Sequence, residues 1–391
     1  MERHRALPGS VWALGFVSLL MDVSSEMIHS LLPVFMVTVL GTSALTVGLI
    51  EGSAEALALI VKVFSGVWSD YIGKRKPLAL LGYGMAALTK PLFAVATGAG
   101  TVLTARLVDR LGKGIRGAPR DALIADLVAP AQRGAAFGLR QSLDTVGAFV
   151  GPALAMGLMF VWANDFRAVF WVAVLPGLLS VAVLAFGVRE PADPAGNRVR
   201  RNPLTRQNLG RMPAAFWAVV AFGAVFTLAR FSEAFLVLRA QQGGVPLAAV
   251  PLVLIVMNVV YAASAYPFGR LADRLPHRQL LAWGLLPLIA ADALLASSAH
   301  WASVGMGVAL WGLHMGMTQG LLAAMVADTS PADLRGTGFG LFNLISGVAM
   351  LVASAMAGAL WDVYGAAFTF IAGGVFVLLS LAGLLVLRRV G

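Results

Sequence analysis

The chain has 391 residues, of which 59% are apolar and only 12% are charged. Soluble proteins carry about 25% charged residues, so this composition excludes an ordinary soluble chain and indicates a polytopic membrane protein with apolar runs of about 20 residues. The net charge of +10 could indicate nucleic-acid binding, whereas the lack of cysteine excludes disulfides, thiolate metal sites and a cysteine nucleophile.

Twelve apolar spans follow one another along the chain. The first comes directly after "MERHRALPGS", which has no small-residue cleavage signal, so we expect no removed signal peptide. The first six predicted spans are Val11–Leu40, Thr46–Ser69, Leu78–Thr97, Val102–Asp126, Arg133–Trp162 and Ala168–Val188. The other six are Ala214–Leu238, Ala249–Gly269, Leu280–Ser298, Ser303–Asp328, Arg335–Ala357 and Ala366–Leu387. We therefore expect an all-α membrane protein with twelve transmembrane helices.

One hydrophilic segment, "REPADPAGNRVRRNPLTRQNLGRMP" at 189–213, lies near the middle of the chain. It predicts an N-terminal six-helix bundle over 1–188, a cytoplasmic linker over 189–213 and a C-terminal six-helix bundle over 214–391.

The basic residues predict the orientation of the spans. With the N-terminus in the cytoplasm, most lysines and arginines of the connections fall on the cytoplasmic side, and only Arg167 and Arg239 fall on the other. Cytoplasmic connections of membrane proteins carry an excess of lysine and arginine, so we expect both termini to be cytoplasmic, in a bacterial-type inner membrane. The basic charge then reflects topology, and nucleic-acid binding is not needed to explain it.

The two halves repeat each other. "RLGKGIRGAPRDALIADLVAPAQRGAAFGL" (110–139) aligns without gaps to "GLHMGMTQGLLAAMVADTSPADLRGTGFGL" (312–341) and pairs Asp126 with Asp328. "GVWSDYIGKRKPL" (66–78) aligns at nearly the same offset to "GRLADRLPHRQLL" (269–281). Six spans per half give both copies the same orientation, which predicts two pseudo-symmetric bundles related by an axis along the membrane normal.

These motifs resemble the major facilitator superfamily of transporters. The two short stretches are similar to its loop motif, G-x-L-A-D-R-x-G-R-[KR]-x-x-L, although Trp68, Ser69 and Tyr71 depart from it in the first copy and Pro276 in the second. "GAFVGPALAMG" resembles the antiporter motif G-x-x-x-G-P-x-x-G-G, with Ala155 and Met156 in place of the last glycines. The resemblance implies gating roles, with Asp126 as the acid that completes the loop motif, for Gly66, Asp70, Gly73, Arg75, Asp126, Gly147, Gly151, Pro152, Gly269, Asp273 and Arg274.

The segment 106–126 is rich in charges although apolar runs flank it. "GKGIRG" fits a dinucleotide-binding fingerprint, but it follows no strand, so that interpretation is weak. At 100° per residue the charged side chains fall within about 140° of arc, which predicts a helix with one polar face toward the bundle interior or water. This face contains Arg106, Asp109, Arg110, Lys113, Arg116, Arg120 and Asp121, and Asp109 can pair with Arg106 or Lys113.

The charged face has five cations and two acids, and carboxylates in the first span can balance this surplus of positive charge. In "MDVSSEMIHSLLP", Asp22, Glu26 and His29 share one helical face. Isolated carboxylates inside a membrane are costly and tend to be protonated or paired. We predict proton coupling for Asp22 and Glu26 together with Arg110, which matches the R-x-x-x-G pattern of the superfamily. The alternative for Asp22 is a permanent ion pair with an arginine.

Other polar residues within spans predict contacts with a substrate. Charged residues within spans are more frequent in the first half of the chain. We therefore expect the residues of ionic coupling in the first half and residues that shape the substrate site in the second half. Arg140 and Asp144 have the spacing of an ion pair on one helix. The predicted substrate-binding residues are His29, Glu55, Lys90, Arg110, Lys113, Arg140, Arg230, Glu233 and Asn258.

Metal binding and enzyme chemistry find little support in the sequence. Met315 and Met317 of "HMGM" lie two residues apart and do not share a helical face. We find no G-x-S-x-G, no H-E-x-x-H and no acidic metal cluster. We expect no enzyme activity, no cofactor and no metal.

The predicted function is secondary active transport by alternating access, with a small-molecule substrate, protons and the lipid bilayer as partners of a monomer. The antiporter motif favours proton-coupled export of an organic solute. The surplus of cations favours an organic anion, imported or exported, and transport of a lipid or a metal complex is a further alternative.

Overall fold

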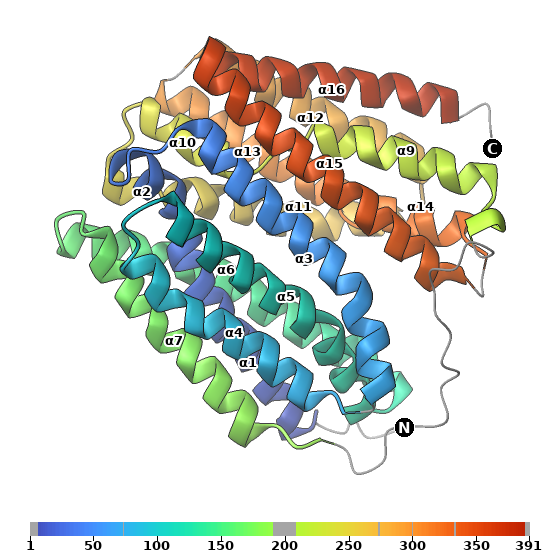
Figure 1. The fold of residues 1–391 in the computed structure, drawn as a ribbon. Helices are drawn as coiled ribbons and strands as arrows, with labels where there is room; N and C mark the ends of the chain where they lie inside the picture. The colour runs from blue at the N-terminus through green and yellow to red at the C-terminus, as the bar shows by residue number, and fades with distance from the viewer. Residues whose placement is uncertain are drawn as a thin grey trace. The chain divides into compact units, whose positions relative to one another are not determined.

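A computed structural model describes residues 7–72, 74–190, 209–272, 274–298, 300–331 and 334–387. In this part of the chain the regular elements are α-helices and two short 3-10 turns, which confirms the predicted all-α fold (Figure 1). Eight helical stretches in these residues are long and apolar enough to cross a membrane, the first of them Gly9–Thr38. Helix α5 (Ala99–Leu127) is also long enough, with 29 residues, but it carries the charged face and is less apolar than these eight.

Each of the twelve predicted spans coincides with one helix or with two consecutive helices. In the first half these are α1 (Gly9–His29) with α2 (Leu32–Thr38), α3 (Ala44–Ile72), α4 (Lys76–Ala94), α5, α6 (Arg133–Val161) and α7 (Phe166–Gly187). In the second half they are α9 (Ala214–Leu228) with α10 (Ala234–Gln242), α11 (Leu252–Ala272), α12 (His277–Ser297), α13 (Trp301–Thr318) with α14 (Leu321–Thr329), α15 (Arg335–Tyr364) and α16 (Ala366–Leu387).

The helices group into two compact units. The first comprises residues 1–29 and 61–201, and the second comprises residues 30–60 and 202–391. Residues 30–60, which include α2 and the first part of α3, thus group with the helices that follow the linker. The division of function at the linker remains a prediction.

In the first unit, α1 packs against α6 and α7, while α4 packs against α5 and α7 (Figure 1). Serine hydroxyls join α1 to α7, because Ser24 Oγ donates to the carbonyl of Ala173 at 2.6 Å and Ser180 Oγ donates to that of Val17 at 2.8 Å. Such bonds satisfy polar groups where no water is available. They hold α1, which carries the predicted coupling residues, at a fixed position in this unit.

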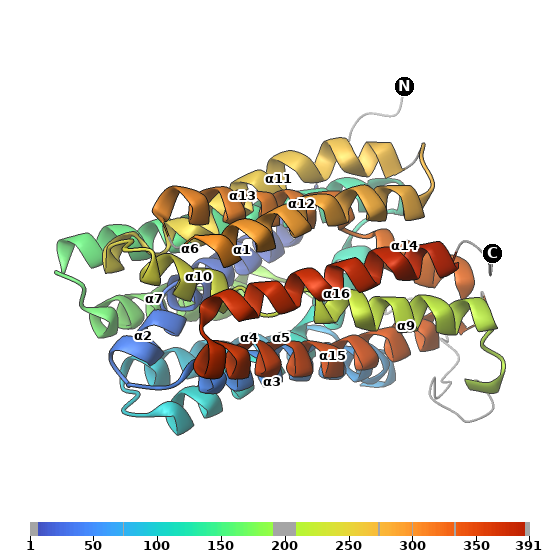
Figure 2. The same ribbon diagram turned by 90° about the horizontal axis from the view of Figure 1, so that it is seen from above.

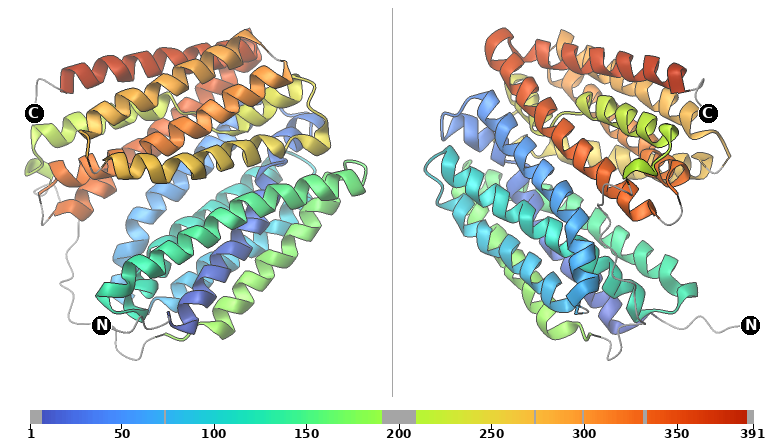
Figure 3. Two further views of the ribbon diagram at one scale, coloured as in Figure 1. Left: turned by 180° about the vertical axis from the view of Figure 1, so that it is seen from behind. Right: turned by 45° about the vertical axis from the view of Figure 1, so that its right-hand side comes forward.

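In the second unit, α13 packs between α11 and α12, and α12 also packs against α16 (Figure 2). In Figure 3 this pair can be followed by colour, with α12 in orange and α16 in red. Helix α15 contacts both α9 and α16. An aromatic group formed by Phe231, Phe235, Trp311 and Phe370 fills the interior beside α10, with neighbouring ring centroids 5.4 to 5.7 Å apart.

Three predicted spans contain a break. The first span is interrupted between His29 and Leu32, the seventh between Leu228 and Ala234, and the tenth between Thr318 and Leu321. At the last break Gly320 has a φ of 75°, a left-handed conformation that glycine adopts without a steric cost. Breaks inside membrane helices occur where the freed backbone groups are buried in protein or line a cavity. The breaks are therefore positions at which a cavity is expected.

Candidate functional site

The two glycines of the predicted antiporter motif lie against the two carboxylates predicted for proton coupling. A Cβ added to Gly147 would come within 2.9 Å of Asp22 Cβ, and one added to Gly151 within 2.7 Å of Glu26 Cβ. Helices α1 and α6 can approach this closely only because α6 lacks side chains at both positions. The sequence predicted both sets of residues, and the structure adds that they form one helix contact.

Asp22 is set among charged side chains from three helices. The groups that act on it electrostatically are Asp144 of α6, Arg116 and Lys113 of α5, and Glu26 of its own helix. Two further acids and two cations therefore surround one carboxyl group. A proton arriving at this position would change the balance of attraction and repulsion between α1, α5 and α6.

His29 joins the carboxylates of α1 to the arginines of α5. Its Nε2 contacts Arg106 Nη1, its Nδ1 lies 3.2 Å from Arg110 Nη2, and Nδ1 also faces Glu26 Oε1 at 3.6 Å. A guanidinium can only donate, so an imidazole that bonds to it must be an acceptor. A neutral ring fits these contacts if Nε2 accepts from Arg106 and, at 3.4 Å, from Arg110 Nη2. Its Nδ1–H then points toward Glu26 and makes no hydrogen bond to Arg110. His29 is thus placed to relay changes at Glu26 to the charged face of α5.

Lys90 of α4 forms a buried ion pair with the same face. Its Nζ lies 2.8 Å from Asp109 Oδ1 and 2.9 Å from Ser25 Oγ, and the residue is 0% exposed. The sequence predicted partners for Asp109 on its own helix, and the structure supplies one from α4. Ser25 was missed because a serine inside an apolar span has no distinctive pattern. The ammonium of Lys90, predicted to bind substrate, is engaged by two protein groups.

Farther along α5 the cations also have protein partners. The guanidinium of Arg116 lies over the ring of Tyr83 at 4.5 Å, and Arg120 Nε donates to Asp121 Oδ1 at 3.0 Å. Arg140 Nη1 lies 2.7 Å from Asp144 Oδ2, so the ion pair predicted from their spacing is present. Lys113, which also acts electrostatically on Asp22, has an exposed side chain. We conclude that the charged face of α5 is largely occupied, with Lys113 at its accessible edge.

Two of the predicted gating residues form an ion pair. Arg75 Nη1, just before α4, lies 2.7 Å from Asp126 Oδ2 at the end of α5, with side-chain exposures of 8% and 11%. Glu190 Oε1 accepts from the backbone N–H groups of Arg75 and Lys76 and so caps α4. The sequence did not single out Glu190, because it begins the hydrophilic linker. The loop after α3 is thereby fixed to α5 and to the end of α7.

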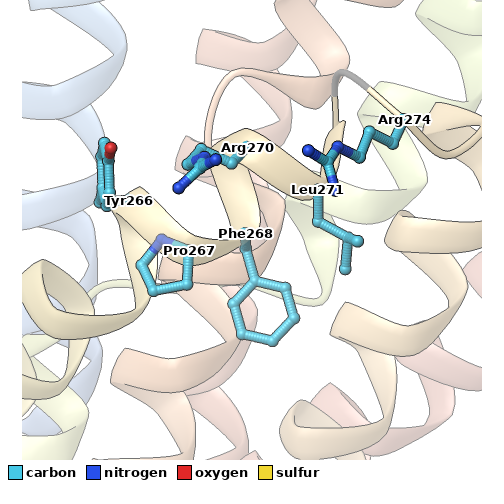
Figure 4. A pocket seen from close by; sticks show the side chains of 6 residues that line it. All are labelled: Tyr266, Pro267, Phe268, Arg270, Leu271 and Arg274. Carbon is cyan, nitrogen blue, oxygen red and sulfur yellow. The ribbon is translucent and has the colours of Figure 1, made fainter.

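The ion pair at the second copy of the loop motif is more exposed than the one at the first copy. His277 Nδ1 lies 3.8 Å from Asp328 Oδ2, with side-chain exposures of 31% and 68%. A shallow pocket of about 520 Å³ at the end of α11 is lined by six residues that include Arg270 and Arg274 (Figure 4). Gly269 has open space around it. Of the other predicted gating residues, Gly73 and Asp273 lie outside the described residues. The surroundings of Gly66 and the side chain of Asp70 are not described either.

A second cavity, of about 380 Å³, lies within the second unit. In the part of the chain that the structure describes, Arg230 is the one charged residue that lines it, and its guanidinium lies 5.7 Å from the ring of Phe226. Glu55, Glu233 and Asn258 are half-buried and do not line it. The other lining residues are polar or apolar without charge, namely Leu59, Phe226, Thr227, Tyr261, Met315, Thr318, Gln319, Gly320, Leu322, Ala323, Phe342, Asn343, Ser346 and Met350.

Two of the helix breaks meet at this cavity. Arg230 belongs to the segment between α9 and α10, while Gln319 and Gly320 form the break between α13 and α14. Tyr261 of α11 donates its hydroxyl hydrogen to Gln319 Oε1. The hydroxyl of Ser346 is buried and has no hydrogen-bond partner among the described residues. The cavity therefore offers a cation, hydroxyl groups and an amide to one small molecule.

Comparisons with known proteins agree with this architecture. The family model of the Major Facilitator Superfamily matches residues 14–257 and 234–391. An uncharacterized MFS-type transporter of Methanocaldococcus jannaschii is 33% identical over 99% of this chain and 96% of its own length. The multidrug resistance protein MdtH of Photorhabdus laumondii is 30% identical over 40% of this chain and 38% of its own length.

A solved structure gives the same result for the fold. The crystal structure of a mutant of the peptide transporter POT has a TM-score of 0.82, with 16% identity over 100% of this chain and 96% of that one. The helices, the two repeated motifs and these matches lead to one conclusion. The chain belongs to the major facilitator superfamily and is a multi-pass membrane transporter.

Proposed function

We propose that this protein exports a small organic anion in exchange for protons. The observation that carries the substrate class is the cavity of the second unit, where Arg230 is the one charged residue among the described residues that line it. The guanidinium of the half-buried Arg230 is a strong partner for a carboxylate because it can donate two parallel hydrogen bonds. The methionine and phenylalanine side chains around it suit an apolar body. An amphipathic monocarboxylate matches both features.

Proton coupling is supported by the contact between α1 and α6. Asp22 and Glu26 lie at this contact, and His29 connects them to Arg106 and Arg110. Protonation of either carboxyl group would weaken its attraction to the cations of α5 and lower the repulsion between the acids. In the proposed mechanism Asp22 and Glu26 bind the proton, and Arg110 changes its contacts in response. The structural alternative is that these charges only hold the helices together.

The proposed mechanism is alternating access between the two halves that flank the linker at 189–213, with both termini in the cytoplasm and the protein acting as a monomer in the inner membrane. The repeated loop motifs support this view because each would close one half on the cytoplasmic side. In the first copy, Arg75 and Asp126 form the clamp. Release of that pair would accompany the change of access. Lys113, at the accessible edge of α5, is the proposed additional contact for the anion.

Export is favoured over uptake by the motif in α6 and by the similarity to MdtH, a multidrug resistance protein. Uptake of an organic anion is the second candidate, and the surplus of cations on α5 is what favours it. The two differ in the direction of proton movement. An exporter exchanges outgoing solute for incoming protons, whereas a symporter moves both in the same direction.

The experiment that tests the proposal measures internal pH in proteoliposomes that contain a pH-sensitive dye. Vesicles with the full-length protein would receive aromatic and aliphatic monocarboxylates or, separately, cationic amphiphiles. We expect alkalinisation of the lumen with carboxylates only, because internal protons leave as the anion enters. Acidification would indicate symport instead. A response confined to the cationic amphiphiles would overturn the proposed substrate class.

Substitution of Arg230 adds a test of direct contact with the anion. Arg230→Gln should raise the concentration for half-maximal flux by about ten- to a hundredfold, because hydrogen bonds to a charged group contribute about 1.5–3 kcal/mol. Arg230→Lys should retain part of the activity. The matched control is Arg239→Gln, a buried arginine of the same unit that donates to the carbonyl of Leu295 at 2.9 Å. Equal losses in the glutamine variants would argue against a direct contact with substrate.

A further inference from the structure

Asp292 is a buried carboxyl group that the proposed mechanism does not use. It lies on α12, the residue is 2% exposed, and neither carboxyl oxygen has a hydrogen-bond partner among the described residues. Carboxylates at such positions are normally paired, because removing a charge from water without compensation is very costly. This carboxyl group therefore calls for a physical explanation.

The surroundings of Asp292 fit a neutral group. A Cβ added to Gly373 of α16 would lie 2.9 Å from Asp292 Oδ2 and 3.0 Å from Phe231 Cε1. The ring of Phe231 in turn packs against Phe235, Phe370 and Trp311. The carboxyl group thus faces the backbone of α16 and an aromatic wall. A sodium ion needs several oxygen ligands, which these side chains do not supply, whereas a proton needs only the carboxyl group.

Charged and titratable groups on the packed helices are engaged elsewhere. Arg239 of α10 donates to the carbonyl of Leu295, one turn farther along α12, and His314 Nδ1 of α13 bonds to the carbonyl of Gly284 at 2.6 Å, two turns before. On α16 the positions that face Asp292 are Gly373 and Gly374. We propose that Asp292 is a second proton-binding site, protonated in this packing and able to ionise only when the contact between α12 and α16 opens.

The position of Asp292 links this proton-binding site to the cavity through two neighbouring residues, Phe231 and Arg230. Phe231 follows Arg230 directly in the chain, and both belong to the break between α9 and α10. Arg230 lines the cavity on one side of this segment, while Phe231 reaches the neighbourhood of Asp292 on the other. Opening of the contact between α12 and α16 would displace Phe231 and with it Arg230. This link to transport rests on the proposed function, whereas proton binding by Asp292 does not.

The first test measures the unfolding of the purified full-length protein in detergent as a function of pH. Because the folded state binds a proton that the unfolded chain releases, the free energy of unfolding should fall as pH rises above the ordinary range of a carboxylic acid. Asp292→Asn should reduce this dependence and be more stable than the unchanged protein at high pH. Asp328→Asn, whose side chain is 68% exposed, is the matched control and should keep the slope.

Two further measurements test whether Asp292 carries a proton. The infrared difference spectrum between the unchanged protein and Asp292→Asn at neutral pH should contain the carbonyl band of one protonated carboxyl group. Asp292→Leu should also fold, because an apolar side chain of similar size suits a neutral site. Parallel pH slopes in the unchanged protein and Asp292→Asn, or a difference spectrum without this band, would overturn the proposal. So would a collapse of both variants at every pH, which would indicate a charged and paired carboxylate.

Transport by Asp292→Asn then tests the link to the cavity separately. We expect flux in proteoliposomes to become less dependent on pH, whereas Asp165→Asn, at an exposed residue that caps the start of α7, should behave like the unchanged protein. Unaltered pH dependence would refute the link and leave proton binding by Asp292 to be judged by the unfolding and infrared measurements. Failure of the unchanged protein to transport carboxylates would overturn the proposed function and, with it, this link, but not the proton site.

Discussion

The segments 110–139 and 312–341 derive from the same repeat and differ in structure. In the first unit the repeat begins within α5, one continuous helix whose charged face is engaged by His29, Lys90 and Tyr83. In the second unit the same part of the repeat is divided into α13 and α14 by a break at Gln319 and Gly320, and it carries no lysine or arginine before Arg335. The broken copy contributes to a cavity, while the continuous copy supports a network of charges. A repeat can thus preserve the helical frame of a transporter while the chemistry of its two copies diverges.

Of the two aspartates that the repeats align, Asp126 should give the stronger response to substitution. Asp126→Asn removes the charge from a mostly buried pair with Arg75, and we expect the free energy of unfolding to fall by about 3 kcal/mol. Asp328→Asn alters a mostly exposed pair with His277 and should cost less than about 1 kcal/mol. Denaturant unfolding in detergent measures both. Similar losses would remove the asymmetry between the two units.

The charged face of α5 gives the second prediction. Arg110→Ala removes a guanidinium that lies 3.2 Å from His29 Nδ1, and transport should fall at least roughly tenfold while the protein still inserts and folds. Initial rates in proteoliposomes, corrected for the amount of inserted protein, provide the measurement. Arg133→Ala, an exposed arginine at the start of α6, is the control and should retain full activity. Full activity of Arg110→Ala would leave α5 with a structural role only.

The break in the second repeat should respond most weakly. Gly320 has a φ of 75°, so Gly320→Ala forces a side chain into a left-handed conformation at a cost of about 1–2 kcal/mol. Gly305→Ala in α13 places its Cβ in open space and should be neutral or stabilising. Thermal unfolding of the two variants compares the costs. If Gly320→Ala were as stable as Gly305→Ala, the break would not depend on this conformation.

The helices were predictable from the sequence because an apolar run of sufficient length has few alternatives to a helix inside a membrane. The positions of the spans, the repeat and the ion pair between Arg140 and Asp144 all follow from local spacing. The contact between Lys90 and Asp109 does not, since it depends on how α4 packs against α5. The cavity was missed for a related reason. Tyr261, Gln319 and Ser346 come from three separate parts of the chain and converge only in the folded unit.

Asp292 shows a further limit of sequence patterns. It was visible as an isolated acid in an apolar span, but its meaning depends on Gly373, which lies far away in the chain. The sequence indicates which side chains are costly inside a membrane and does not tell which neighbours remove that cost. Tertiary packing decides between a paired and a neutral carboxyl group.

The close contact between α1 and α6 also has an evolutionary consequence. Gly147 faces Asp22 and Gly151 faces Glu26 at distances that leave no room for a methyl group. A relative that acquires a larger residue at either glycine must move the two helices apart, and its acids on α1 would then face a wider, wetter gap. Substitutions at 22 and 147, and at 26 and 151, should therefore occur together when many relatives are aligned. Gly157 of the same helix, which has open space around it, should vary independently of α1.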